Sequence, residues 1–229
     1  MSVQLTRHQF TVDDYHAMVV AGALKEDDRV ELIEGEIVDM TPIGLRHAAA
    51  VNILNRWLVT GCGRRAIVQV QGPIQIGLRS EPQPDLGALR PEDDFYRNKA
   101  ATPDDVLLLI EVADRSLLYD RRVKLPLYAR AGVREVWIVD LVRDEVQIHR
   151  EPTPTGFAHA ERRGRGARLE PAAFPDLTLS VDELLAPGPA PARAQVLGQA
   201  EDALAQDIAE DLRGIGAEAA ARGQDAPPP

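Results

Sequence analysis

An uninterrupted apolar run, Val106 to Ile110, is followed directly by Glu111 and Val112. A run of this length between polar segments is typical of a β-strand that is buried on both faces. Such strands lie in central sheets that helices cover. A carboxylate beside a buried strand is costly unless it is paired or coordinates a metal, so Glu111 is a candidate for chemistry. The alternative is that Glu111 lies at the carboxyl end of the strand and reaches water.

The segments around this strand predict further helices and strands. Helices are expected at 11–24, where Thr11 can be the N-cap, at 47–59, and at 117–131, where Gly132 can end the helix. A β-hairpin is expected at 29–41 with its turn at Glu34-Gly35. Other strands are predicted at 66–71, 73–78, 86–89, 133–140 and 145–149, and a short strand or turn with a short helix at 174–185. The polar segment 90–105 is predicted to be a surface loop, and no element is predicted for the polar segment 151–166. This order indicates an α/β fold with a central mixed β-sheet flanked by helices.

The chain of 229 residues is long enough for one domain and a tail. Its composition changes at Pro187, which predicts a domain over 1–186 and a Pro/Ala-rich linker with an acidic, partly helical or disordered tail over 187–229. The single cysteine, Cys62, excludes an internal disulfide and a cysteine-rich zinc cage, and it fits a reducing cytosol. No apolar run reaches the roughly 18 residues of a membrane helix, and the polar N-terminus lacks the apolar core of a signal peptide. The expectation is a cytoplasmic protein without a membrane segment.

A second acid, Asp85, suits a site built around Glu111. It follows Pro84 and precedes the predicted strand 86–89, and the ligands of α/β folds gather where strands end. The alternative is a turn aspartate, because Pro-Asp pairs are frequent in turns.

A lysine on the predicted helix 117–131 completes the candidate set. Asp120, Lys124 and Tyr128 are spaced i, i+4 and i+8, so they share one stripe of that helix. The alternative for Lys124 is a solvated helix face. Pro126 removes one backbone donor inside the helix, which predicts a kink there or a helix that starts close to Lys124.

Together, Asp85, Glu111 and Lys124 are the groups that metal-assisted phosphodiester hydrolysis requires. Two carboxylates offer hard oxygen ligands to Mg²⁺ or Mn²⁺. The metal can polarise the phosphate and lower the pKa of bound water. A nearby ammonium can orient that water or balance charge on the pentavalent phosphorus.

A set of motifs makes a resemblance to a known family specific. In chain order they are Glu31-Leu32-Ile33-Glu34-Gly35-Glu36-Ile37-Val38, His47, Pro84-Asp85, Ile110-Glu111-Val112-Ala113-Asp114, Tyr119-Asp120, Lys124-Leu125, Tyr128-Ala129 and Gly132-Val133-Arg134-Glu135-Val136-Trp137-Ile138-Val139-Asp140. With them the chain, over residues 11–185, resembles the Uma-two (Uma2) family of endonucleases, bacterial members of the PD-(D/E)xK superfamily. The resemblance implies a restriction-endonuclease-like fold.

The resemblance also implies roles for the three candidates. Asp85 and Glu111 would be the motif acids that hold the metal, with the carbonyl of Val112 as a further ligand. The usual motif lysine would fall two residues after the glutamate, where this chain has Ala113. Lys124, on the following helix, would take its place.

Three other residues are implied as accessory groups. Glu31 would be the extra acid that many superfamily members place near the metal, and Glu36 is a rival for that role. Alternatively, both are surface charges of the hairpin. His47 would contact the phosphate or an acid that is not itself a metal ligand, or else serve as a capping or structural group at the start of a helix.

These residues indicate a Mg²⁺-dependent endonuclease that hydrolyses DNA by in-line attack of a metal-bound water. A homodimer would fit, because such nucleases often pair to cut two strands. The formal net charge of −10 argues against strong nonspecific binding to DNA. Together with Ala113 in the usual lysine position, it favours the alternative of a catalytically inactive binding or assembly module with the same fold. A nuclease acting on RNA or a small nucleotide is the second alternative.

Overall fold

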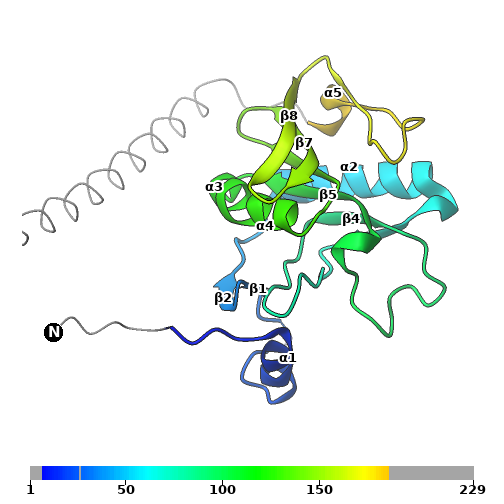
Figure 1. Ribbon diagram of the computed structural model, residues 1–229. Helices are drawn as coiled ribbons and strands as arrows, with labels where there is room; N and C mark the ends of the chain where they lie inside the picture. Colours follow the sequence, from blue (N-terminus) through cyan, green and yellow to red (C-terminus); the bar gives the residue numbers. More distant parts are fainter. Residues whose placement is uncertain (1–6, 26, 186–229) are drawn as a thin grey trace, which may run out of the picture. The chain divides into compact units, whose positions relative to one another are not determined.

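The computed structural model describes residues 7–25 and 27–185, and within them the predicted α/β fold is confirmed (Figure 1). A six-stranded sheet in the order β3-β4-β5-β6-β7-β8 forms its centre. β5 and β6 are parallel and the other neighbouring pairs are antiparallel, so the sheet is mixed. The strands are β3 (Ile67–Val70), β4 (Leu86–Leu89), β5 (Val106–Ala113), β6 (Glu135–Asp140), β7 (Glu145–Thr153) and β8 (Gly156–Gly164).

The alternation of side chains along β5 decides which way Glu111 points. Leu108 and Ile110 pack with α2 (Leu45–Cys62) in one apolar cluster. Leu109, between them, packs in a second cluster with Tyr128 of α4 (Leu125–Arg130). Because successive side chains of a strand point to opposite faces, Glu111 lies on the α4 face of the sheet.

The helical segment after β5 contains a π-helical turn. It runs through α3 (Leu117–Tyr119), the π-helix η3 (Asp120–Lys124) and α4, and the N–H of Leu125 donates to the carbonyl of Asp120, five residues earlier. Pro126 has no N–H, so the bond that it would make in a regular α-helix is missing at this place. The predicted helix is therefore confirmed over 117–130, and its last part, α4, starts at Leu125, directly after Lys124. Turns of this kind are frequent at functional sites.

The predicted N-terminal helix and hairpin are also present. α1 (Val12–Val20) has Thr11 as its N-cap, in a reciprocal capping box with Asp14. β1 (Val30–Ile33) and β2 (Glu36–Asp39) form the hairpin. Both turn residues, Glu34 and Gly35, have positive φ values, 51° and 86°, as the tight turns of hairpins require.

Two segments differ from the prediction. The strand predicted at 73–78 was wrong: only isolated bridges occur there, at Ile74 and Ile76, and Gly77 turns the chain with a φ of 62°. Conversely, β7 extends to Thr153 and β8 covers much of the polar segment 151–166. β8 lies at the edge of the sheet and its side chains are mostly exposed, so its sequence has no apolar alternation to detect.

The remaining described elements are short: η1 (Gly63–Arg65), η2 (Pro103–Asp105), β9 (Arg168–Leu169), β10 (Leu179–Ser180) and α5 (Val181–Leu184). β9 pairs with β10. The tail and its predicted start at Pro187 lie outside the described residues, so that domain division stays a prediction. Within residues 7–25 and 27–185, no helix combines the length and the apolar character needed to cross a bilayer.

Candidate functional site

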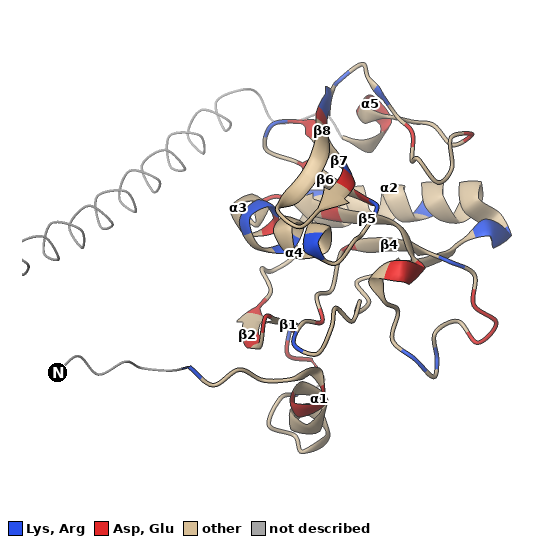
Figure 2. Cartoon of the chain, in the orientation of Figure 1, with Lys and Arg blue, Asp and Glu red and all other residues tan. Residues whose placement is uncertain are grey.

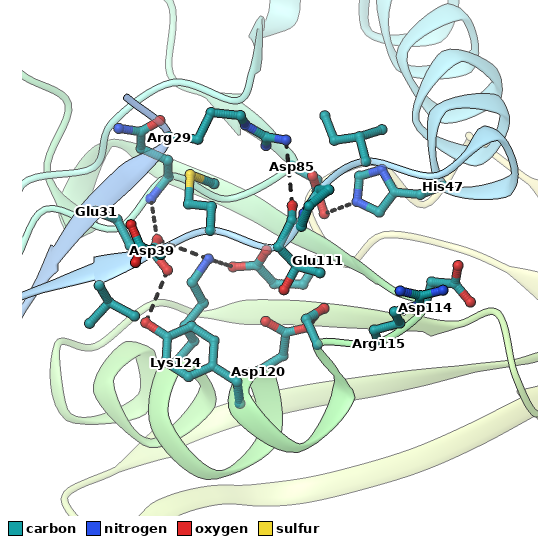
Figure 3. Close-up of a pocket in the computed structure, with 18 of the residues that line it drawn as sticks. Arg29, Glu31, Asp39, His47, Asp85, Glu111, Asp114, Arg115, Asp120 and Lys124 are labelled. Carbon is teal, nitrogen blue, oxygen red and sulfur yellow. Dashed lines mark hydrogen bonds and ion pairs between the residues drawn. The ribbon is translucent and has the colours of Figure 1, made fainter. Parts of the chain in front are cut away.

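A pocket of about 490 Å³ lies where the hairpin, the first turn of α2 and the helical segment after β5 meet (Figure 3). Five of the residues singled out from the sequence line it: Glu31, His47, Asp85, Glu111 and Lys124. These side chains come from five different parts of the chain, so the fold alone brings them together.

The register of the sheet explains why Asp85 lies beside the end of β5. β4 begins at Leu86, which pairs with Ile110 of β5. Directly before β4, the side chain of Asp85 also bonds to β5: its Oδ2 accepts a hydrogen bond from the N–H of Val112 at 2.8 Å. The residue that follows Glu111 therefore helps to orient the Asp85 carboxylate.

Two side chains complete the surroundings of Asp85. Nε2 of His47 lies 3.0 Å from Oδ2 of Asp85, and Nε2 of Gln71 donates to Oδ1 at 3.3 Å. The N-cap of α2 is Gly44, so His47 does not have the capping role that was one alternative for it. Nδ1 of His47 is buried without a hydrogen-bond partner among the described residues. His47 thus contacts Asp85, which is itself a candidate metal ligand.

Glu111 is a buried carboxylate with donors on one of its oxygens. Its Oε1 accepts a hydrogen bond from the Tyr128 hydroxyl at 2.7 Å and lies 3.2 Å from Nζ of Lys124. Both contacts that the described residues make with this carboxylate are to Oε1, which leaves Oε2 for another partner. Burial raises the pKa of Glu111 to about 8, although Lys124 acts in the opposite direction.

Glu31 holds the ammonium of Lys124 from the other side. Its Oε2 lies 3.0 Å from Nζ of Lys124 and accepts the N–H of Gln83 at 3.0 Å, and its Oε1 accepts the Tyr119 hydroxyl at 3.0 Å. Figure 3 shows Lys124 between Glu31 and Glu111. Because Glu31 pairs directly with the ammonium of Lys124, its geometry suits a residue that positions the lysine.

The charges around Lys124 keep it protonated. Burial by itself lowers the pKa of Lys124, but the neighbouring Glu111, Glu31 and Asp120 raise it, and the net shift is above the ordinary value. Burial also raises the pKa of Asp120 to about 6, and Oδ2 of this residue accepts the Ser116 hydroxyl at 2.7 Å. The pocket therefore contains a permanent cation among buried carboxylates.

One accessory candidate lies elsewhere, and two donors were not anticipated. Glu36 does not line the pocket: it is exposed on β2, and its carboxylate pairs with Arg7 at 3.2 Å. The hydroxyl donors Tyr119 and Tyr128 were not predicted as parts of the site. The position of Tyr128 four residues after Lys124 was the signal that could have identified it.

The candidate metal ligands of the pocket are two carboxylates, Asp85 and Glu111. Among residues 7–25 and 27–185, no group of three or more His, Cys, Asp or Glu side chains is arranged to hold a metal ion. Mg²⁺ is usually bound by one or two carboxylates together with waters and substrate phosphates, and Asp85 and Glu111 fit that pattern.

Comparisons with known proteins agree with the fold. The model of the Uma2 family, described as "Putative restriction endonuclease", matches residues 12–182. A crystal structure described as a "putative nuclease belonging to DUF820", from Anabaena variabilis ATCC 29413, matches with a TM-score of 0.58 and 17% sequence identity, and covers 76% of this chain and 97% of that chain. At this identity the likeness shows a shared fold only. A search of curated proteins gives no significant match. Because the family model matches most of its length, the chain belongs to the Uma2 family.

Proposed function

We propose that this protein is a Mg²⁺-dependent nuclease that hydrolyses phosphodiester bonds of DNA. The observation that carries the proposal is the convergence at Glu111. Its buried carboxylate lies 3.2 Å from the ammonium of Lys124, and the next residue, Val112, donates its N–H to Asp85 at 2.8 Å. Two acids and one lysine therefore share a pocket that opens to solvent.

Asp85 and Glu111 are the residues that would hold the cation. Asp85 is held through Oδ2 by Val112, and Glu111 is held through Oε1, so each carboxylate is pre-oriented by this chain. The N–H and C=O of one strand residue point to the same edge of the strand, which directs the carbonyl of Val112 toward the Asp85 side as well. When bound, Mg²⁺ supplies polarisation of a phosphoryl oxygen.

Lys124 has two tasks in this proposal. Its ammonium orients an attacking water beside Glu111, and it stabilises negative charge that develops on the phosphate. Glu31 keeps Nζ of Lys124 in place through a 3.0 Å ion pair, and Tyr128 fixes the carboxylate that the lysine faces. Groups held in this way need little rearrangement during the reaction, which is the main source of electrostatic catalysis.

His47 would act on Asp85. With its Nε2 3.0 Å from Oδ2 of Asp85, His47 limits the rotation of that carboxylate. Partners of metal ligands commonly set ligand orientation, and their loss typically reduces metal affinity or activity by roughly 10–100-fold.

The test is cleavage of plasmid, single-stranded DNA and RNA with Mg²⁺ or Mn²⁺. Asp85→Ala, Glu111→Ala and Lys124→Ala are each expected to remove metal-dependent cleavage. Glu36→Ala is the matched acid control, because Glu36 is exposed outside the pocket, and it should cut like the wild type. Cleavage that persists in all three pocket variants would contradict the proposal. If only RNA is cleaved, the protein is a nuclease of RNA and not of DNA. Binding without cleavage would favour an inactive binding module.

A further inference from the structure

The catalytic candidates are nearly buried in the pocket that they line. Asp85, Glu111 and Lys124 are 8%, 3% and 4% exposed. The pocket of about 490 Å³ is within the roughly 300–1,000 Å³ that pockets for single small molecules occupy. A scissile phosphate has to enter this space to approach Glu111. A nucleotide in a duplex is paired and stacked, so it cannot enter the pocket without its neighbours and the second strand. An unpaired nucleotide can enter alone.

The charge of the pocket also disfavours a duplex. Its lining contains six Asp and Glu side chains and three cationic side chains, so acids outnumber cations there. Duplex binding draws its affinity from many phosphate contacts along a dense row of charges, and the whole chain has a net charge of −10. Figure 2 shows acidic residues on the β1–β2 hairpin and basic residues on the helical segment of α3 and α4. The two cations nearest solvent in the lining, Arg29 and Arg115, suit local contacts to the phosphates of one strand.

The rim of the pocket presents apolar side chains to solvent. Ile43, in the loop between β2 and α2, lines the pocket and is 42% exposed. Leu45, the first residue of α2, is not a lining residue itself but directly follows Gly44, which lines the pocket, and it is 92% exposed. A phosphate gains nothing from such side chains, but the apolar face of an unpaired base can pack against them. Among the described residues, the first turn of α2 has no side-chain cap, so its N–H groups can donate hydrogen bonds to an anion beside these residues.

Resting on the proposed nuclease function, we propose that the substrate is an unpaired DNA strand. One nucleotide enters the pocket, its phosphodiester reaches Asp85 and Glu111, and its base lies against Ile43 and Leu45. Paired DNA is accepted only where it is open, as in a bubble, a flap or an unpaired end.

The experiment uses one labelled oligonucleotide in three forms: single strand, blunt duplex, and duplex with a central unpaired bubble. Cleavage with Mg²⁺ or Mn²⁺ and binding by fluorescence anisotropy are measured in parallel on the full chain. We expect kcat/KM for the single strand and the bubble to exceed that for the blunt duplex by about tenfold or more, with cuts confined to unpaired positions.

Rim variants test where the base lies. Ile43→Ser and Leu45→Ser should each weaken single-strand binding by about threefold or more, because apolar contact area is lost. Val59→Ser is the matched control, since Val59 is 53% exposed on α2 but lies near the end of the helix opposite to Leu45, and it should bind like the wild type. Equal loss in all three variants would contradict the placement of the base.

The outcomes separate this inference from the proposed function. If the blunt duplex is cut as efficiently as the single strand, and the pocket variants abolish that cutting, the nuclease stands and the preference for unpaired DNA is wrong. If no form is cut and none is bound, the proposed function fails and the inference fails with it. If the single strand is bound selectively but never cut, the preference stands without the nuclease.

Discussion

Replacing Lys124 with methionine should destabilise the folded protein strongly. The substitution keeps the length and apolar stem of the side chain but removes the ammonium, which lies 3.0 Å from Oε2 of Glu31 and 3.2 Å from Oε1 of Glu111. Both carboxylates are buried, at 2% and 3% exposure. Breaking a buried ion pair from one side costs about 3–5 kcal/mol. Glu31 and Glu111 keep hydroxyl and main-chain donors, so we expect the lower end, about 3 kcal/mol.

The loss of folding stability caused by Lys124→Met should be larger at higher pH. Burial raises the pKa of Glu111 to about 8 from its ordinary value of 4.5, so between these values the folded state holds a proton that the unfolded state releases. Stability then falls as pH rises through this window. Removing Lys124 takes away the group that opposes the rise in the pKa of Glu111, so the deficit of Lys124→Met should be larger at pH 8 than at pH 5.5.

Urea unfolding of the metal-free protein at both pH values measures this effect. Lys99→Met is the matched control: Lys99 pairs with Glu92 at 2.8 Å, but its side chain is 51% exposed, so the change should be within about 0.5 kcal/mol. The double variant Lys124→Met/Glu111→Gln should recover part of the loss. If Lys124→Met unfolds at the same urea concentration as Lys99→Met, the ammonium is not buried between two acids and the reasoning is refuted.

Three other substitutions test other parts of the structure. Glu31→Gln should lower the cleavage rate about tenfold or more while changing the Mn²⁺ dissociation constant by less than about threefold. Glu111→Gln should weaken the binding of Mn²⁺ about tenfold or more, and calorimetry measures both dissociation constants. If the two variants weaken Mn²⁺ binding equally, Glu31 is a metal ligand. Glu135→Ala should lower the free energy of unfolding by about 3 kcal/mol, because Arg150 loses a buried partner 2.7 Å away, and a value below about 1 kcal/mol in urea unfolding would contradict this. Burial lowers the pKa of His149 to about 4 from 6.5, so the free energy of unfolding should fall as pH decreases from about 6.5 to 4. His149→Phe should reduce that fall. An unchanged dependence of stability on pH in this variant would contradict the role given to His149.

The helices, strands and turns that could be predicted from the sequence are those whose structural environment requires particular residue types. β5 is buried on both faces, and its run of Val, Leu and Ile indicates this directly. The hairpin turn at Glu34-Gly35 was identifiable because glycine accepts the positive φ that the turn needs. β8 was missed because both of its faces are largely exposed at the sheet edge, so polar residues are accepted along its whole length.

The candidate site was predictable in its members but not in its contacts. Asp85, Glu111 and Lys124 follow from motif and spacing, and the pocket contains all three. Their partners depend on tertiary structure: Glu31 reaches Lys124 only because the hairpin packs against the segment before β4, where the N–H of Glu81 donates to the carbonyl of Leu32. No local pattern encodes a contact between segments so far apart in the chain.

A crystal soaked in Mn²⁺ and measured for anomalous scattering tests the central claim most directly. The account predicts one strong peak in the pocket, within ligand distance of carboxylate oxygens of both Asp85 and Glu111, and its absence from crystals of the Asp85→Ala protein. A peak bound by Glu31 without Asp85, or an empty pocket in crystals that bind Mn²⁺ elsewhere, would contradict it.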